Sequence, residues 1–140
     1  MSPNSDLTRF LSAQSPVIDG VLAELRAGSK ASHWMWFIFP QLGALGRSAT
    51  ARIYGIDDLE HARRYLDHPV LGPRLLECTR AVLAHGDRSA HAIFGSPDDL
   101  KFRSCMTLFG LAGPQHPEFR QALDLFYGGE PDPLTVRLLA

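Results

Sequence analysis

Apolar residues recur along most of this chain at the three- and four-residue spacing of helices that bury one face. Leu71, Leu75, Cys78 and Val82 form the clearest stripe and predict a half-buried helix. Shorter stripes predict further helices at 7–11, 17–25, 59–68, 102–112, 119–126 and 133–139. The alternating pattern of strands is nearly absent, so the sequence predicts an all-α fold, a single compact multi-helix domain.

Residues that start and stop helices flank these stripes. Asp57 with Glu60 three residues later forms an acidic capping box, and S-P-D-D at 96–99 is a second start signal. Glycines follow five apolar runs at positions where a left-handed residue commonly ends a helix: Gly28, Gly55, Gly86, Gly95 and Gly128.

The segment from Trp34 to Pro40 departs from this periodicity. Its seven consecutive apolar residues, W-M-W-F-I-F-P, fit both a buried strand and a buried stretch of helix, and both assignments stay open. The domain is therefore predicted to contain an aromatic-rich central segment.

Length and charge narrow the class of protein. With 140 residues and no internal repeat or long linker, residues 1–140 are expected to form one domain around one core. The net charge is -1 and the basic residues are scattered, so neither nucleic acid nor an anionic membrane is a predicted partner.

The cysteines and the N-terminus indicate the compartment. Cys78 and Cys105 lie within helical patterns and lack a C-x-x-C spacing, which favours buried thiols over a disulfide or a zinc site. Residues 1–11 have no secretory pattern, and no apolar run approaches the roughly 20 residues that span a bilayer. We therefore expect a cytoplasmic protein without a membrane span.

Four blocks of the sequence stand out. They are H-W-M-W-F-I-F-P-Q at 33–41, Y-L-D-H-P-V-L-G-P-R-L at 65–75, D-D-L-K-F-R-S-C-M-T-L-F at 98–109 and G-G-E-P-D-P-L-T at 128–135. Together they resemble a family of small bacterial proteins, domain of unknown function 1810, over about residues 6–140. The resemblance implies a predominantly helical fold and assigns no catalytic residue. Members are sometimes described as calpastatin-like, but this chain lacks the disordered, charged composition of a calpain inhibitor.

Polar residues bracket the aromatic segment. His33 precedes it and Gln41 follows it, which is typical of a small-molecule site where polar groups border an apolar wall. In such a site Trp36 would stack on the ligand, while His33 would orient it or exchange a proton. The alternative is that the rings belong to the core and His33 binds the adjacent turn.

The turn after the aromatic segment is a second candidate. Arg47 and Ser48 follow Gly43 and Gly46, and Ser48 can cap a short helix, so free N–H groups and a guanidinium would attract an anion. The spacing G-x-x-G-R-S is not that of a P-loop, and a plain loop with a helix cap is the simpler alternative.

Lys101 and Ser104 are the third candidate. They lie three residues apart and share one face of a predicted apolar helix. Lys101, one of only two lysines, either binds a phosphate or carboxylate near a pocket wall or lays its apolar stem along the core.

No motif in the sequence fixes a reaction. The six histidines form no metal-binding pattern, no nucleophile motif is present, and neither a metal nor a cofactor is predicted. His33 is the one candidate for a catalytic role, and enzymatic activity is undecided.

These observations support one leading hypothesis and one alternative. The leading hypothesis is that the protein binds a small anionic or nucleotide-like metabolite in an aromatic-lined pocket formed by His33, Trp36, Gln41, Arg47, Ser48, Lys101 and Ser104. The alternative is a protein-interaction module with an exposed aromatic patch, because tryptophan and arginine favour binding hot spots.

Overall fold

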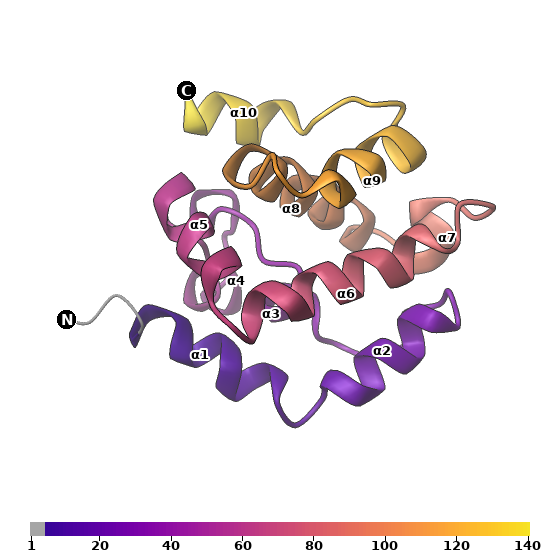
Figure 1. The fold of residues 1–140 in the computed structure, drawn as a ribbon, viewed down its shortest axis with the longest axis horizontal. Coiled ribbons are helices and arrows are strands. Elements are labelled where there is room, and N and C mark those ends of the chain that lie inside the picture. The colour runs from indigo at the N-terminus through magenta and orange to yellow at the C-terminus, as the bar shows by residue number, and fades with distance from the viewer. Residues whose placement is uncertain (1–4) are drawn as a thin grey trace.

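Helix α8 (Asp98–Ala112) lies at the centre of the structure, and the other helices pack around it (Figure 1). A computed structural model describes residues 5–140; the expected domain also includes residues 1–4, which lie outside the described part. The described residues form ten α-helices and no strand, so the predicted all-α fold is confirmed. The other elements are α1 (Ser5–Gln14), α2 (Ile18–Arg26), α3 (Met35–Ile38), the 3-10 turn η1 (Gly43–Leu45), α4 (Ala49–Ile53), α5 (Leu59–Asp67), α6 (Leu71–Leu83), α7 (Ala90–Phe94), α9 (Pro117–Tyr127) and α10 (Pro133–Leu139).

The composition of α8 explains its central place. Phe102, Cys105, Met106, Leu108 and Phe109 are all fully buried, so apolar side chains surround the helix instead of forming one stripe. Helices α5, α7, α9 and α10 pack against it on different sides. In Figure 1, α9 and α10 lie along one edge of the molecule, and α1 and α2 lie along the opposite edge.

The helix limits follow most of the sequence signals. Three of these glycines have a positive φ, Gly28, Gly95 and Gly128, and Gly128 has the left-handed helical conformation, whereas Gly95 has ψ 177°. The prediction is wrong for Gly55 and Gly86, neither of which has a positive φ. Gly55 is needed for packing instead, because a Cβ atom there would lie 2.3 Å from the Cα atom of Gly43.

Two other helix starts differ from the sequence pattern. The signal at 96–99 does mark the start of α8, but Pro97 occupies the capping position and no side chain caps the helix there. The pattern does not reveal α7, which is capped by Ser89, because five residues are too short to show helical periodicity.

The segment from Trp34 to Pro40 contains the short helix α3. Four side chains of this segment are at most 2% exposed: Trp34, Met35, Ile38 and Phe39. Phe39 meets Phe94 and Phe102 edge to face, with ring centroids 5.9 and 5.0 Å apart. Most of the aromatic segment is therefore core.

One buried amide holds this segment from the side of α1. Gln14 is 1% exposed, and its Nε2 donates to the backbone oxygen of Phe37 at 2.6 Å and to the Tyr65 hydroxyl at 2.9 Å. Because an unpaired buried amide is costly, these bonds fix how α1 and α5 meet the aromatic segment.

The Glu24 carboxylate holds the segment from the side of α2. Oε1 accepts from the backbone N–H groups of Ala31 and Ser32 and from Trp34 Nε1, at 2.6, 3.0 and 3.0 Å, and Oε2 accepts from the Ser32 hydroxyl. Burial alone would raise the pKa of Glu24, but these hydrogen bonds outweigh it and lower the pKa from 4.5 to about 2.

We predict that Glu24→Gln lowers the free energy of unfolding at neutral pH by about 1 to 2 kcal/mol. This value is at the low end for hydrogen bonds to a charged group, because Glu24 is only partly buried. Because the folded-state pKa is lowered, this stability is present above the unfolded pKa near 4.5 and is lost as the pH falls toward about 2. Thermal unfolding at several pH values should show the two proteins converging in acid. Glu77→Gln is the control, because the Glu77 side chain is half exposed and its ion pair with Arg26 is long, at 3.9 Å. A constant difference at every pH would contradict the assignment.

Candidate functional site

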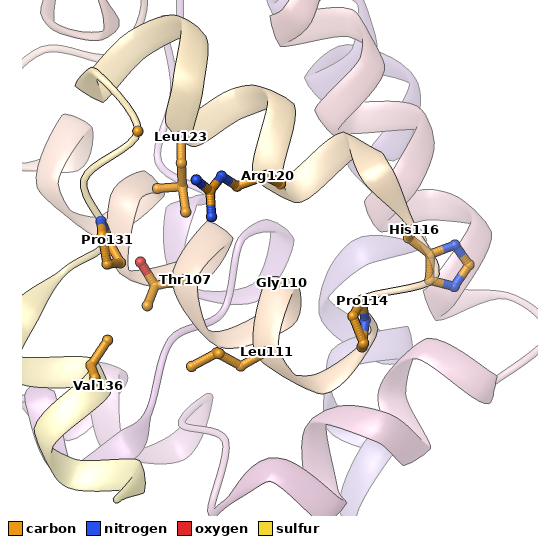
Figure 2. A pocket seen from close by; sticks show the side chains of 10 residues that line it. Thr107, Gly110, Leu111, Pro114, His116, Arg120, Leu123, Pro131 and Val136 are labelled. Atoms are coloured by element: carbon orange, nitrogen blue, oxygen red, sulfur yellow. The ribbon is translucent and has the colours of Figure 1, made fainter.

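A cavity of about 320 Å³ lies between α8, α9 and the segment that leads into α10 (Figure 2). Three neighbouring positions on one face of α8 form its floor, and the rest of the wall comes from α9, from α10 and from the turns that follow α8 and α9. The lining residues are Thr107, Gly110, Leu111, Pro114, His116, Arg120, Leu123, Gly129, Pro131 and Val136. Most of these side chains are apolar.

Local sequence explains why the walls stand apart. Gly110 has no side chain, and a Cβ atom there would lie 3.6 Å from the Cβ atom of Phe119, so α9 lies close to α8 at this point. Leu111 is 47% exposed and Val136 is 41% exposed, and Figure 2 shows the two facing each other across the cavity. The cavity therefore presents aliphatic surface that the fold does not bury.

Three polar side chains border the cavity. The Arg120 guanidinium lies beside Leu123 and faces Thr107, while the His116 ring turns away from the other lining residues (Figure 2). Arg120 Nε donates to Asp124 Oδ1 at 3.1 Å, and its side chain is 72% exposed. Arg120 is thus the principal positive charge of the site.

The Thr107 hydroxyl is fully used within the protein. It donates to the backbone oxygen of Arg103 at 2.8 Å and accepts from the backbone N–H of Asp132 at 2.9 Å. Thr107 is therefore part of the wall and also an anchor for the chain that enters α10.

Asp132 attaches α10 to α8. Its Oδ2 accepts hydrogen bonds from the hydroxyls of Ser104 at 3.0 Å and Thr135 at 2.5 Å, and from the Thr135 backbone N–H at 3.2 Å. The outer side chains of α10 stay 41–47% exposed: Leu134, Val136 and Leu138. This wall of the cavity is therefore held mainly by polar contacts at the start of α10. Apolar burial along the helix contributes less.

The structure brings together two of the residues that the sequence singles out, Trp36 and Lys101. Lys101 Nζ lies 4.7 Å from the centre of the Trp36 ring, a cation–π contact, and 3.5 Å from Asp98 Oδ1. Lys30 reaches the same carboxylate at 2.9 Å and lies 5.0 Å from the Trp34 ring. Both lysines of the chain therefore share one aspartate beside the two tryptophans.

His33 lies in a different place. It is exposed and lines a cavity of about 330 Å³ together with Trp34, Ser32 and Glu24 of the α2 side. The remaining lining residues come from the start of α2: Pro16, Val17, Gly20 and Val21. Lys101 and Arg47 are not among the residues of this wall.

The other predicted site residues have structural neighbours of their own. The half-buried Gln41 accepts from the Ile56 backbone N–H through its main-chain oxygen at 2.9 Å. The Ser48 hydroxyl caps α4 by accepting from Ala51 N at 3.1 Å, beside the exposed Arg47. Ser104 binds Asp132, so it faces α10 while Lys101 faces Trp36.

Both cysteines are buried. Burial raises the pKa of Cys78 to about 12 and holds the pKa of Cys105 well above its usual value. A thiolate at either position is therefore strongly disfavoured.

Residues 5–140 contain neither a candidate metal site nor a candidate membrane span. No set of three or more His, Cys, Asp or Glu side chains in this part of the chain is grouped so that it could hold a metal ion. None of its helices combines the length and the apolar character needed to cross a bilayer.

Known proteins place the chain in a family. Residues 4–139 match the family described as protein of unknown function, DUF1810. The chain belongs to this family. It is also similar to the conserved hypothetical protein Rv1873 from Mycobacterium tuberculosis, which has a crystal structure. The two chains share 54% sequence identity, the match covers 96% of each chain, and the TM-score is 0.94. No curated protein matches the sequence. The family resemblance seen in the four sequence blocks is confirmed, and it brings no known activity.

The sequence offered little sign of the cavity. His116-Pro117 and residues 128–135 mark helix ends, and Arg120 is one polar residue on an amphipathic helix. Nothing in such patterns places the end of α9 and the start of α10 on the same side of α8. Because apolar residues surround α8, the periodicity of its sequence does not mark Leu111 as the exposed one.

We predict that Asp132→Ala loosens α10 without unfolding the domain. Loss of the helix cap and of the Ser104 contact, about 1 to 2 kcal/mol for a cap alone, should speed amide exchange in residues 134–140 at least tenfold. Hydrogen exchange followed by mass spectrometry measures this, with the exposed Asp87→Ala as the control. Uniform acceleration across α8 and α9 would show that α10 does not open separately.

We also predict that neither cysteine reacts with a disulfide-type thiol reagent at about pH 8 while the protein is folded, because burial disfavours both thiolates. Absorbance of the released thiol should show no labelling in buffer and labelling of both cysteines in denaturant. Stoichiometric labelling of the folded protein would refute the burial of these residues.

Proposed function

We propose that this protein binds a small anionic metabolite in the cavity between α8, α9 and α10. The observation that carries the proposal is a single guanidinium, that of Arg120, at the border of a cavity with mainly apolar walls. Small-molecule sites usually combine such walls with a few polar groups, and the volume of about 320 Å³ fits a small ligand.

Arg120 keeps the capacity to bind an anion. Its contact with Asp124 uses Nε, and the two terminal nitrogens carry four further N–H groups. A carboxylate or phosphate can accept two parallel hydrogen bonds from a guanidinium. The apolar remainder of the ligand would cover Leu111 and Val136, whose exposed surface gains most from the removal of water.

The pair formed by Trp36 and Lys101 is a second proposed location for an anion, one with an aromatic or nucleotide-like group. Their cation–π contact supports it, because a planar ligand could stack where Trp36 is half exposed. Lys30 and Lys101 share the Asp98 carboxylate, so this cluster carries one excess positive charge, although an entering anion would approach that carboxylate. In this proposal the other predicted residues, His33, Gln41, Arg47, Ser48 and Ser104, would need to turn toward the same ligand.

A protein-interaction role is the second candidate function. The exposed apolar side chains that favour it are aliphatic: Leu134, Val136 and Leu138 on α10. Leu134 and Leu138 are four residues apart and therefore share one face of α10, which can bind a partner. The aromatic version of this hypothesis has less support, because Trp34 and Phe39 are buried.

The test is thermal unfolding of the purified protein with a panel of carboxylates, nucleotides and sugar phosphates. A ligand at about 100 times its dissociation constant stabilises the native state by about 2.7 kcal/mol, which raises the melting midpoint by several degrees. We expect one class to do so, and Arg120→Gln to reduce the rise. Arg52→Gln is the matched control, because Arg52 is an exposed arginine on α4. A rise that is lost in Lys101→Ala but kept in Arg120→Gln would move the site to Trp36, and a flat panel would favour protein interaction.

A further inference from the structure

We infer that the ligand of the cavity between α8, α9 and α10 is a short aliphatic monocarboxylate. This inference rests on the proposed function and specifies it. It follows from the chemistry of the walls, from the charges around Arg120 and from the size of the cavity.

The apolar wall is aliphatic throughout. Leucine, valine and proline side chains supply it: Leu111, Leu123, Val136, Pro114 and Pro131. Phenylalanine, tyrosine and tryptophan are absent from the lining, and the one ring, that of His116, turns away from the other lining residues (Figure 2). A nucleobase would find no ring to stack on, whereas an alkyl chain finds matching surface on several sides.

The charges around Arg120 favour a ligand with one negative charge over a ligand with two. Asp124 already lies 3.1 Å from Arg120 Nε, so the pair has no net charge, and a phosphate dianion would meet a carboxylate beside the guanidinium. A planar carboxylate needs only the two parallel N–H groups of one guanidinium edge.

The start of α9 offers no phosphate cradle in addition. Pro117 lacks an N–H group, and Glu118 places its own carboxylate in the first turn, where it binds Arg80 at 2.6 Å. The positive end of the helix is therefore occupied by a side chain of the protein. This leaves Arg120 as the anion-binding group of the cavity.

The size of the cavity sets the length of the chain. A volume of 320 Å³ corresponds to roughly ten non-hydrogen atoms at about 30 Å³ for each water-sized group. Octanoate is of this size. Shorter alkanoates leave part of the wall wet, and much longer ones extend past the opening.

The experiment is calorimetric titration of the full chain with butanoate, hexanoate, octanoate and dodecanoate, each below its micelle concentration. Affinity should rise about three- to fourfold for each added methylene, equivalent to about 0.8 kcal/mol per buried methylene, and should stop rising once the cavity is full. Octanol, which has a similar chain and no charge, should bind at least tenfold more weakly than octanoate.

Two variants locate the binding. Arg120→Gln should weaken octanoate at least tenfold and leave octanol unchanged, and Arg52→Gln should change neither. Leu111→Trp should abolish the binding of both octanoate and octanol, because the larger side chain fills the cavity. Circular dichroism should show an intact fold, since Leu111 is 47% exposed. Amide NMR shifts caused by octanoate should gather at Gly110, Leu111 and Gly129.

The outcomes separate this inference from the proposed function. Binding of a nucleotide or sugar phosphate that Arg120→Gln and Leu111→Trp abolish, with no binding of alkanoates, would overturn the inference and keep the proposed function. Alkanoate binding without dependence on chain length would also overturn it. Alkanoate binding that neither variant affects would place the ligand elsewhere and overturn both.

Discussion

The rings gathered around Phe102 join the parts of the chain that the sequence keeps far apart. Phe102 of α8 stacks on Phe94 with centroids 4.7 Å apart and meets Phe39 at 5.0 Å, while Phe126 and Tyr127 of α9 approach within 6.3 and 6.5 Å. One side chain thus connects the aromatic segment, α7, α8 and α9. Because large rings bury much area in fixed geometry, the position of each of these elements depends on this cluster.

The cluster also explains why the aromatic segment is a core element and the cavity lies elsewhere. The polar contacts of Gln14 and Glu24 hold this segment at the core, so little of it is left for a ligand. The cavity lies at another face of α8, where Thr107, Gly110 and Leu111 border a space that no phenylalanine, tyrosine or tryptophan lines. The same helix therefore supplies the centre of the core and the floor of the cavity.

The sequence predicts the helices better than it predicts the site. Local signals are sufficient for α6, α8, α9 and α10, because spacing and capping act within a few residues. Gly55 was assigned to a helix end because glycine favours that position, yet its cause is the close approach of Gly43, a contact between distant residues. The predicted site depends on contacts of the same kind: Lys101 and Trp36 meet, while Ser104, three residues from Lys101, binds Asp132. A cavity formed by three helices depends on how they pack, which periodicity along one helix does not contain.

Thr107 connects the position of α10 to the cavity between α8, α9 and α10. Its hydroxyl receives the backbone N–H of Asp132, and its side chain forms part of the cavity floor. Val136 of α10 also lines the cavity, so a ligand that touches Val136 has this contact only while α10 is docked. Binding and docking are then thermodynamically linked, and the linkage is reciprocal. A molecule held in the cavity would favour the docked position of α10 by the same free energy by which a docked α10 favours that molecule, so the C-terminal helix would report on occupancy without being touched by the charged group of the ligand.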